Sequence, residues 1–249
     1  MIPVVDIAHI AEELRRVAEE LEVAYDDLGG DSDTDPTVLL KALDGLLDGL
    51  RTLEGEQPQG TLGTGEIRLG DKDIHALGEH GMILLSSLSA LAGRLRRPQE
   101  ARIIEGLALP FACWISRQGG EIATISPAVN GAAALANTLK QPAELEQLYG
   151  LMSELVNAVS PLVSQDTSST DPTRPWRVLL INRAIVATRS YHPVLMNEAF
   201  QALLEHLPQE ASDFFREGME QMEALNYPPH VRRVMEAYYE HWCEQRVLH

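Results

Sequence analysis

Hydrophobic residues recur with a seven-residue period at the start of the chain. The a and d positions of this pattern are Ile7, Ile10, Leu14, Val17, Leu21, Ala24 and Leu28. Such a heptad seam predicts one amphipathic helix from Asp6 to Leu28. It also predicts a homodimer contact through the a positions Ile7, Leu14, Leu21 and Leu28.

A second amphipathic pattern follows after a short acidic turn. Asp35 and Pro36 are a helix-start signal, an N-cap acid followed by proline, and leucines then recur at Leu39, Leu43, Leu46, Leu50 and Leu53. We therefore expect residues 1–53 to form an acidic αα-hairpin and the glycine-rich residues 54–70 to be a linker. Because two helices have too little core to stand alone, the leucine face is expected to dock on the rest of the chain or on another copy.

Beyond the linker, prolines occur at helix-length intervals, and proline is favoured in the first turn of a helix. The helices predicted from this punctuation span residues 71–97, 99–118, 127–140, 142–163, 175–191, 193–207, 209–225 and 228–246. Strand signals are nearly absent. The predicted fold is all-α, with residues 71–249 forming one helical-repeat domain of consecutive antiparallel hairpins.

Helix pairs of about 34 residues recur in this domain. They span residues 127–163, 175–207 and 209–246. Small and aromatic residues mark them, at Ala132–Asn137 before Pro142–Leu145, and at Ala199-Phe200 before Leu207-Pro208. Over residues 99–246 the chain thus resembles the tetratricopeptide-like α-solenoid superfamily. The resemblance implies a concave surface that binds another protein. HEAT-like pairs or an irregular helical bundle are alternatives on the same pattern.

The net charge of the chain indicates which classes of partner it can bind, and its cysteines indicate the compartment. The chain has 20 Lys and Arg against 37 Asp and Glu, a net charge of −17. This charge repels a phosphate backbone, so no nucleic acid partner is expected. The apolar stretch from Met82 to Ala92 is too short to span a bilayer. The start lacks a secretory signal, and Cys113 and Cys243 form no metal or CxxC motif, so we expect a cytoplasmic protein without membrane contact.

A histidine and a glutamate provide the one candidate metal site. His75 and Glu79 are four residues apart, so on a helix they share a face and could hold a metal ion. The simpler interpretation is a polar helix face that Asp71 and Asp73 cap at its start. We expect no cofactor, since no phosphate-binding, dinucleotide-binding or nucleophile motif is present.

Arginines and aromatic residues near the C-terminus are candidates for partner binding, although packing within the chain explains them as well. Guanidinium groups suit the carboxylates of a partner, whereas methionine and aromatic side chains suit adaptable apolar contacts. The candidates are Arg174, Trp176, Arg177, Arg183, Tyr227, Met235, Tyr238, Tyr239 and Trp242. From the sequence we therefore expect a noncatalytic protein-interaction scaffold. The alternative is an all-α enzyme, or a small-ligand or metal-binding protein, with its pocket between helices.

Overall fold

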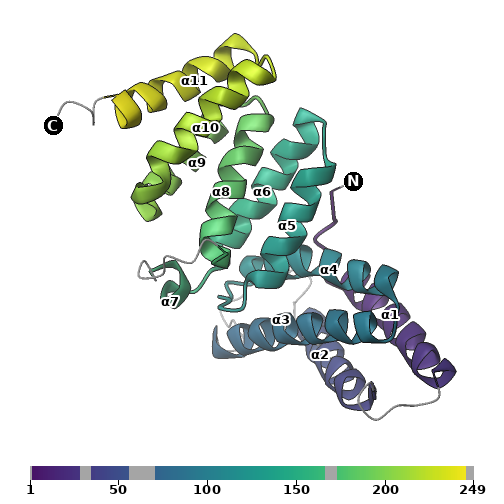
Figure 1. The fold of residues 1–249 in the computed structure, drawn as a ribbon. Helices are drawn as coiled ribbons and strands as arrows, with labels where there is room; N and C mark the ends of the chain where they lie inside the picture. The colour runs from purple at the N-terminus through teal and green to yellow at the C-terminus, as the bar shows by residue number, and fades with distance from the viewer. Residues whose placement is uncertain (1, 29–34, 56–70, 166–172, 245–249) are drawn as a thin grey trace. The chain divides into compact units, whose positions relative to one another are not determined.

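The protein is all-α in the computed structural model, which describes residues 2–28, 35–55, 71–165 and 173–244 (Figure 1). Its helices are α1 (Ile7–Asp27), α2 (Thr37–Gly55), α3 (Asp71–Arg94), α4 (Pro98–Arg117), α5 (Ser126–Thr138), α6 (Pro142–Ala158), α7 (Pro161–Ser164), α8 (Pro175–Arg189), α9 (Pro193–His206), the 3₁₀ turn η2 (Pro208–Glu210), α10 (Ala211–Ala224), α11 (Pro229–Tyr239) and the π-helical turn η3 (Glu240–Glu244). The described residues contain no β-strand, and the backbone pairing of Ile122 with Val159 is an isolated bridge. None of the helices in these ranges is both long and apolar enough to span a bilayer.

Local signals in the sequence set most helix starts. Asp6 caps α1, where its carboxylate accepts hydrogen bonds from the backbone N–H of Ala8 at 2.8 Å and of His9 at 3.1 Å. Among the described residues, seven helices and turns begin at a proline, namely α4, α6, α7, α8, α9, η2 and α11. The spacing of the prolines predicts these starts, except for that of α7 at Pro161. Of the predicted linker, residues 56–70 lie outside the described residues.

One predicted helix is broken in the structure. The sequence predicts a single helix over residues 142–163, but α6 ends at Ala158 and α7 starts at Pro161. Between them the backbone pairs with the segment after α4, where Ile122 N–H donates to Ala158 at 2.7 Å and Ser160 N–H donates to Ile122 at 3.0 Å. These tertiary hydrogen bonds replace helical ones, and helical spacing alone does not reveal them.

The chain divides into two compact units. Unit 1 comprises Met1–Ile2, Ala133–Ser153 and Pro161–His249, and unit 2 comprises Pro3–Ala132 and Glu154–Ser160. The N-terminal hairpin therefore lies in one unit with α3 and α4, although the sequence predicts a domain boundary between them. The physical reason is the leucine face of the hairpin, which packs on α3 and α4.

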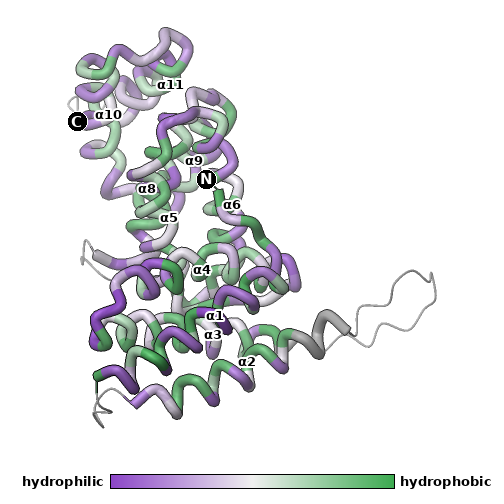
Figure 2. Tube along the Cα trace, turned by 90° about the vertical axis from the view of Figure 1, so that its right-hand side faces the viewer, coloured by the Kyte–Doolittle hydropathy of each residue, from purple (hydrophilic) through white to green (hydrophobic). Residues whose placement is uncertain are grey.

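In unit 2, α1 packs on α4, α2 on α3, and α3 on α4. Figure 2 shows hydrophobic and hydrophilic residues alternating along α1 and α2, as expected for helices that bury one face. Ile7, Leu14 and Leu21 are buried within the chain, whereas Leu28 is 49 % exposed. The expectation that the leucine face docks on the rest of the chain is thus met. Three of the four residues of the predicted homodimer contact are thus part of the core, which leaves Leu28 alone on the surface.

Unit 1 consists of packed helices from the C-terminal part of the chain. Helix α8 packs on α9, α10 packs on α11, and α9 also contacts α11. Its core includes the fully buried rings of Trp176, Phe200 and Phe215. Three connections between helices lie at one end of this unit, namely those after α5, α8 and α10 (Figure 1).

Candidate functional site

His75 and Glu79 lie on one face of α3, as their spacing predicts, and both bind the segment that joins α4 to α5. His75 Nδ1 accepts a hydrogen bond from the backbone N–H of Glu121 at 2.6 Å. Glu79 accepts from the backbone N–H groups of Ala123 and Thr124, both at 3.0 Å, and from the Thr124 hydroxyl. The pair therefore anchors this connection within unit 2.

The pKa of Glu79 reflects this role. Partial burial raises the pKa of the carboxyl, but the hydrogen bonds from Thr124 and Ala123 outweigh burial and hold it below the ordinary value. A metal ion would need further ligands beside His75 and Glu79. In the described residues, no group of three or more His, Cys, Asp or Glu side chains is placed to hold one.

Arg183, predicted as a partner-binding residue, is instead buried in unit 1. Its guanidinium lies 4.4 Å from the centre of the Tyr149 ring and donates to the Tyr149 hydroxyl at 2.5 Å and to Ser153 Oγ at 3.0 Å. The Tyr149 hydroxyl donates in turn to Glu198 at 3.2 Å. Burial raises the pKa of Tyr149 to about 12, although Arg183 opposes that shift. This network joins α6, α8 and α9 and leaves Arg183 unavailable to a partner.

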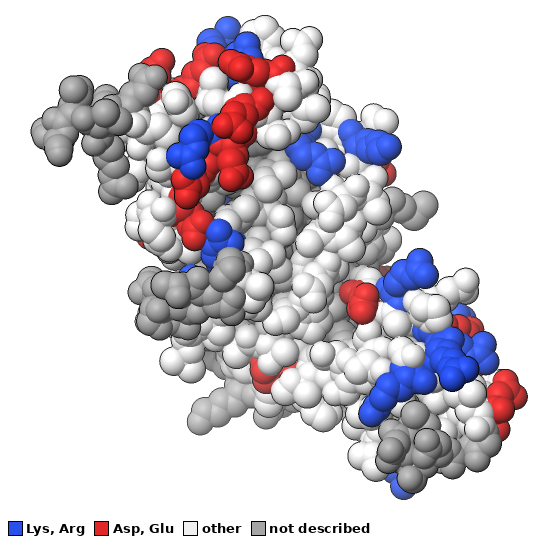
Figure 3. Space-filling view, viewed as in Figure 1, with Lys and Arg blue, Asp and Glu red and all other residues white. Residues whose placement is uncertain are grey.

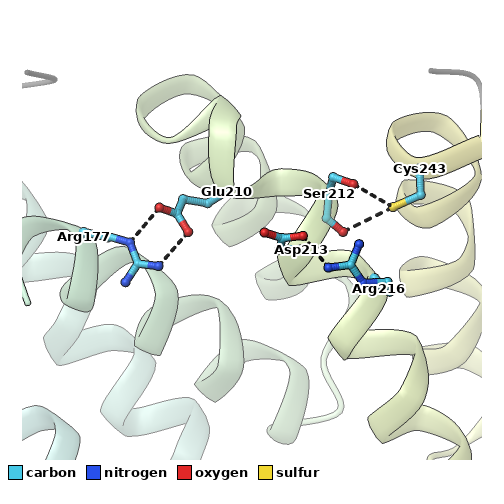
Figure 4. Close-up of polar contacts among 6 residues, drawn as sticks. All are labelled: Arg177, Glu210, Ser212, Asp213, Arg216 and Cys243. Atoms are coloured by element: carbon cyan, nitrogen blue, oxygen red, sulfur yellow. Dashed lines mark hydrogen bonds and ion pairs between the residues drawn. The ribbon is translucent and has the colours of Figure 1, made fainter. Parts of the chain in front are cut away.

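The other arginine candidates lie at the start of α8, and their neighbour Trp176 is buried at 2 % exposure. Figure 4 shows Arg177 facing Glu210, to which it donates at 2.7 and 2.6 Å. The Glu210 carboxylate raises the pKa of Arg177, and the pKa of Glu210 is lowered by the same hydrogen bonds. Arg174 is half-buried beside this ion pair and further lowers the pKa of Glu210. The arginine side chains and the indole ring at the start of α8 therefore make their contacts within unit 1.

One of the C-terminal aromatic candidates, Tyr238, belongs to an aromatic cluster between α9, α10 and α11. The Tyr238 ring stacks on Phe215 at 5.2 Å and meets Phe200 edge-on at 5.1 Å. Met235 is buried at 1 % exposure, so it is not available for binding as predicted. Tyr239 and Trp242 are half-buried.

Close to this cluster, Cys243 is held against the start of α10 (Figure 4). Its thiol donates to the Ser212 carbonyl oxygen at 3.4 Å, and the Ser212 hydroxyl lies 3.8 Å from the sulfur. The same helix carries an ion pair between Asp213 and Arg216. The two contacts of Cys243 with Ser212 fasten η3 to α10.

Two aromatic residues meet where the connections of unit 1 lie side by side. The rings of Tyr191 and Tyr227 contact edge-on, with centroids 5.5 Å apart and planes at 85°. The imidazole Nε2–H of His230 donates to the backbone carbonyl of Tyr191 at 3.0 Å. Arg189 donates to the carbonyl oxygens of Ala136 at 2.5 Å and Leu139 at 2.7 Å, which ties in the end of α5. We call this end of unit 1, residues 139–142, 189–194 and 225–233, the turn edge.

The turn edge combines an unusual backbone with exposed apolar side chains. Tyr191 has φ +60° and Asn226 has φ +50°, and a left-handed φ is costly for a bulky residue such as tyrosine. Tyr191 is nevertheless 40 % exposed, and within the turn edge Val194, in the first turn of α9, is 57 % and Leu225 is 63 % exposed. Of the residues of the turn edge, Tyr227 is the one that the sequence indicates as a candidate for partner binding. Asn226 is of a type that tolerates positive φ, but nothing in the sequence marks Tyr191.

Unit 2 has a shallow surface pocket of about 330 Å³ lined by Glu19, Glu20, Val23 and Arg97. Arg97 also forms a 3.7 Å ion pair with Asp27. None of the predicted site residues lines this pocket.

The chain matches no protein-family profile, and neither the curated proteins nor the solved structures with which it was compared include a match.

Proposed function

We propose that the chain is a noncatalytic helical protein that binds a protein partner through the turn edge of unit 1. The observation that carries this proposal is Tyr191, an exposed aromatic residue at φ +60°. Backbone strain of this kind costs about 1–3 kcal/mol and persists where the surrounding structure fixes it, often at binding sites.

The way in which Tyr191 is held supports this function. Its ring rests on Tyr227, and its carbonyl oxygen is bonded to His230. An aromatic ring fixed before binding loses little conformational freedom when a partner arrives. Tyrosine is also enriched among the residues that contribute most to binding energy at protein interfaces.

The exposed aliphatic residues of the turn edge support it further. Leu225 and Val194 both expose more than half of their surface. Exposed apolar side chains in the same part of the surface as an exposed aromatic ring favour contact with another protein over contact with water. The alternative of an enzyme or ligand-binding protein has less support, because His75, Glu79 and Arg183 are engaged in structural hydrogen bonds.

The test is affinity capture with the full chain and three variants, using extract of the cells that encode it and quantitative mass spectrometry. Tyr191→Asn removes the ring but keeps a residue that tolerates positive φ. Leu225→Ser removes the most exposed aliphatic side chain of the turn edge. Val38→Ser is the matched control, because Val38 is 77 % exposed on α2 in the other unit.

We expect at least one protein that the wild-type chain and Val38→Ser retain equally and that both turn-edge variants lose. Circular dichroism and thermal unfolding should show that all four proteins are folded. If the four retain the same set of proteins in equal amounts, the turn edge is not the binding surface and the proposal is wrong.

A further inference from the structure

The turn edge lacks acidic residues, although the chain as a whole is strongly acidic. Residues 139–142, 189–194 and 225–233 contain Lys140, Arg189, Arg232, Arg233 and two histidines, but no Asp or Glu. The complete chain carries 37 acidic residues and a net charge of −17. Figure 3 shows a band of acidic side chains over α9 and α10 and, apart from it, Lys and Arg side chains near the end where α5 and α8 finish.

We propose that the turn edge binds an acidic segment of the partner protein, in which carboxylates flank an apolar side chain. The apolar side chain would lie against Tyr191, and the carboxylates would face the cations around it. This inference rests on the proposed function and specifies the chemistry of the partner.

The cations of the turn edge differ in their availability. Arg189 is committed to the carbonyl oxygens of Ala136 and Leu139 at the end of α5. Arg232 lies 3.9 Å from Glu236 on the next turn of α11. Lys140 and Arg233 are exposed, and neither forms an ion pair within 4.0 Å among the described residues. These two side chains are therefore the ones that we assign to the carboxylates of the partner.

Hydrogen bonds link the two segments that carry these cations to the connection that contains Tyr191. Lys140 follows Leu139 in the sequence. The carbonyl oxygen of Leu139 accepts a hydrogen bond from Arg189, which lies two residues before Tyr191. Arg233 lies in α11 three residues after His230, which is bonded to Tyr191. Positive charge around an aromatic and aliphatic centre matches the interface pattern of an apolar core with a charged rim.

An acidic protein segment fits the charge of the whole molecule better than a nucleic acid does. A nucleic acid presents a continuous line of phosphates, which the net charge of −17 repels over long range. A short segment can place a few carboxylates against the turn edge alone. Because screening weakens exposed ion pairs, its binding should weaken as salt is added.

The experiment selects ligands without assuming their sequence. A library of random 12-residue peptides displayed on phage is panned against the immobilised full chain. The most enriched peptide is then synthesised with a fluorophore and titrated by anisotropy against the wild-type chain, Tyr191→Asn and the double variant Lys140→Glu/Arg233→Glu. Arg94→Glu is the matched control, since Arg94 is an exposed arginine of unit 2. A single-stranded DNA 12-mer serves as the phosphate probe.

We expect enriched peptides with a net negative charge and at least one large apolar residue. Their Kd should rise by roughly tenfold or more in the double variant, because two attractive contacts become repulsive. It should rise similarly in Tyr191→Asn and change less than about twofold in Arg94→Glu.

The possible failures are distinguishable. Peptides that require Tyr191 but are neutral or basic, or that bind the double variant normally, overturn the acidic partner and leave the proposed function standing. A library that enriches no peptide dependent on Tyr191 overturns both. DNA that binds as tightly as the peptide and is lost in the double variant assigns the cations to phosphates and overturns the inference.

Discussion

Gly81 of α3 lies so close to Phe111 of α4 that a Cβ atom added at Gly81 would come within 2.5 Å of Cε1 of the phenyl ring. Phe111 is buried at 1 % exposure, so its ring has little room to move. We expect Gly81→Ala to lower the free energy of unfolding by about 1–3 kcal/mol, as overpacking of a core does. Urea unfolding followed by circular dichroism measures this change.

Gly45→Ala is the control for that substitution. Gly45 lies in the exposed part of α2, and a Cβ added there has no neighbour within 4 Å. Alanine should therefore stabilise this helix by about 0.5–1 kcal/mol. Opposite signs for the two substitutions would establish that the effect at Gly81 is steric, and a stabilising effect at both would refute the close contact of α3 with α4.

The buried network around Arg183 predicts a graded response to substitution. Arg183→Ala leaves the Tyr149 hydroxyl and Ser153 without their buried donor, and should cost about 3 kcal/mol of unfolding free energy. Tyr149→Phe keeps the ring beneath the guanidinium and removes only the hydroxyl, so it should cost about 1 kcal/mol. Chemical denaturation of both variants tests this order. Equal and small losses would indicate that Arg183 is solvated and that the network contributes little.

The two cysteines should react at different rates. Cys113 is buried at 0 % exposure, and burial raises the pKa of its thiol to about 12. Cys243 is half-buried, and among the described residues its thiol is bonded to Ser212 alone. At pH 8, iodoacetamide should modify Cys243 in the native protein and Cys113 only after denaturant is added. Peptide mass spectrometry distinguishes the sites, and rapid native labelling of Cys113 would contradict its burial.

The helices are largely predictable from the sequence because their signals are local. The heptad of α1 and the prolines at the starts of α4, α8 and α9 act within a few residues. Their effect on helix formation therefore depends little on the tertiary structure. The interruption between α6 and α7 is not local. It depends on the pairing of Ile122 with Val159, which are far apart in the sequence. The glycine contact at Gly81 requires the register of two helices, and helical spacing does not specify it.

The candidate site is less predictable because the sequence does not show which arginines and aromatic residues are buried. Arg183 and Trp176 were equal candidates to Tyr227 in the sequence, yet the first two lie in the core of unit 1. The exposure of Tyr191 depends on a left-handed backbone at the connection of two helices. Such a conformation follows the end of a helix here, as it does at Arg96 and Asn226, and a tyrosine side chain gives no signal for it.

The hydrogen bonds of Glu79 predict a specific dependence of stability on pH. Its pKa is lowered in the folded chain, since the bonds from Thr124 and Ala123 outweigh the opposing effect of burial. In the unfolded chain the carboxyl returns toward its ordinary value of 4.5. The unfolded state therefore binds a proton more readily, and the contribution of Glu79 is present in full above that value and is lost as the pH falls through the folded pKa.

Glu79→Gln removes this proton-binding group while it keeps an acceptor oxygen for the backbone of Thr124. The variant should be less stable than the wild type at pH 7, and the difference should shrink as the pH is lowered from about 6 to about 3. Glu121→Gln is the control. In the part of the chain that the structure describes, the Glu121 carboxylate is exposed and forms no ion pair, so the effect of this substitution should be small at every pH. Urea unfolding across this range measures all three proteins. A difference between wild type and Glu79→Gln that stays constant with pH would mean that the carboxylate is not held by these bonds. The segment after α4 would then have to be anchored by His75 and the pairing of Ile122 alone.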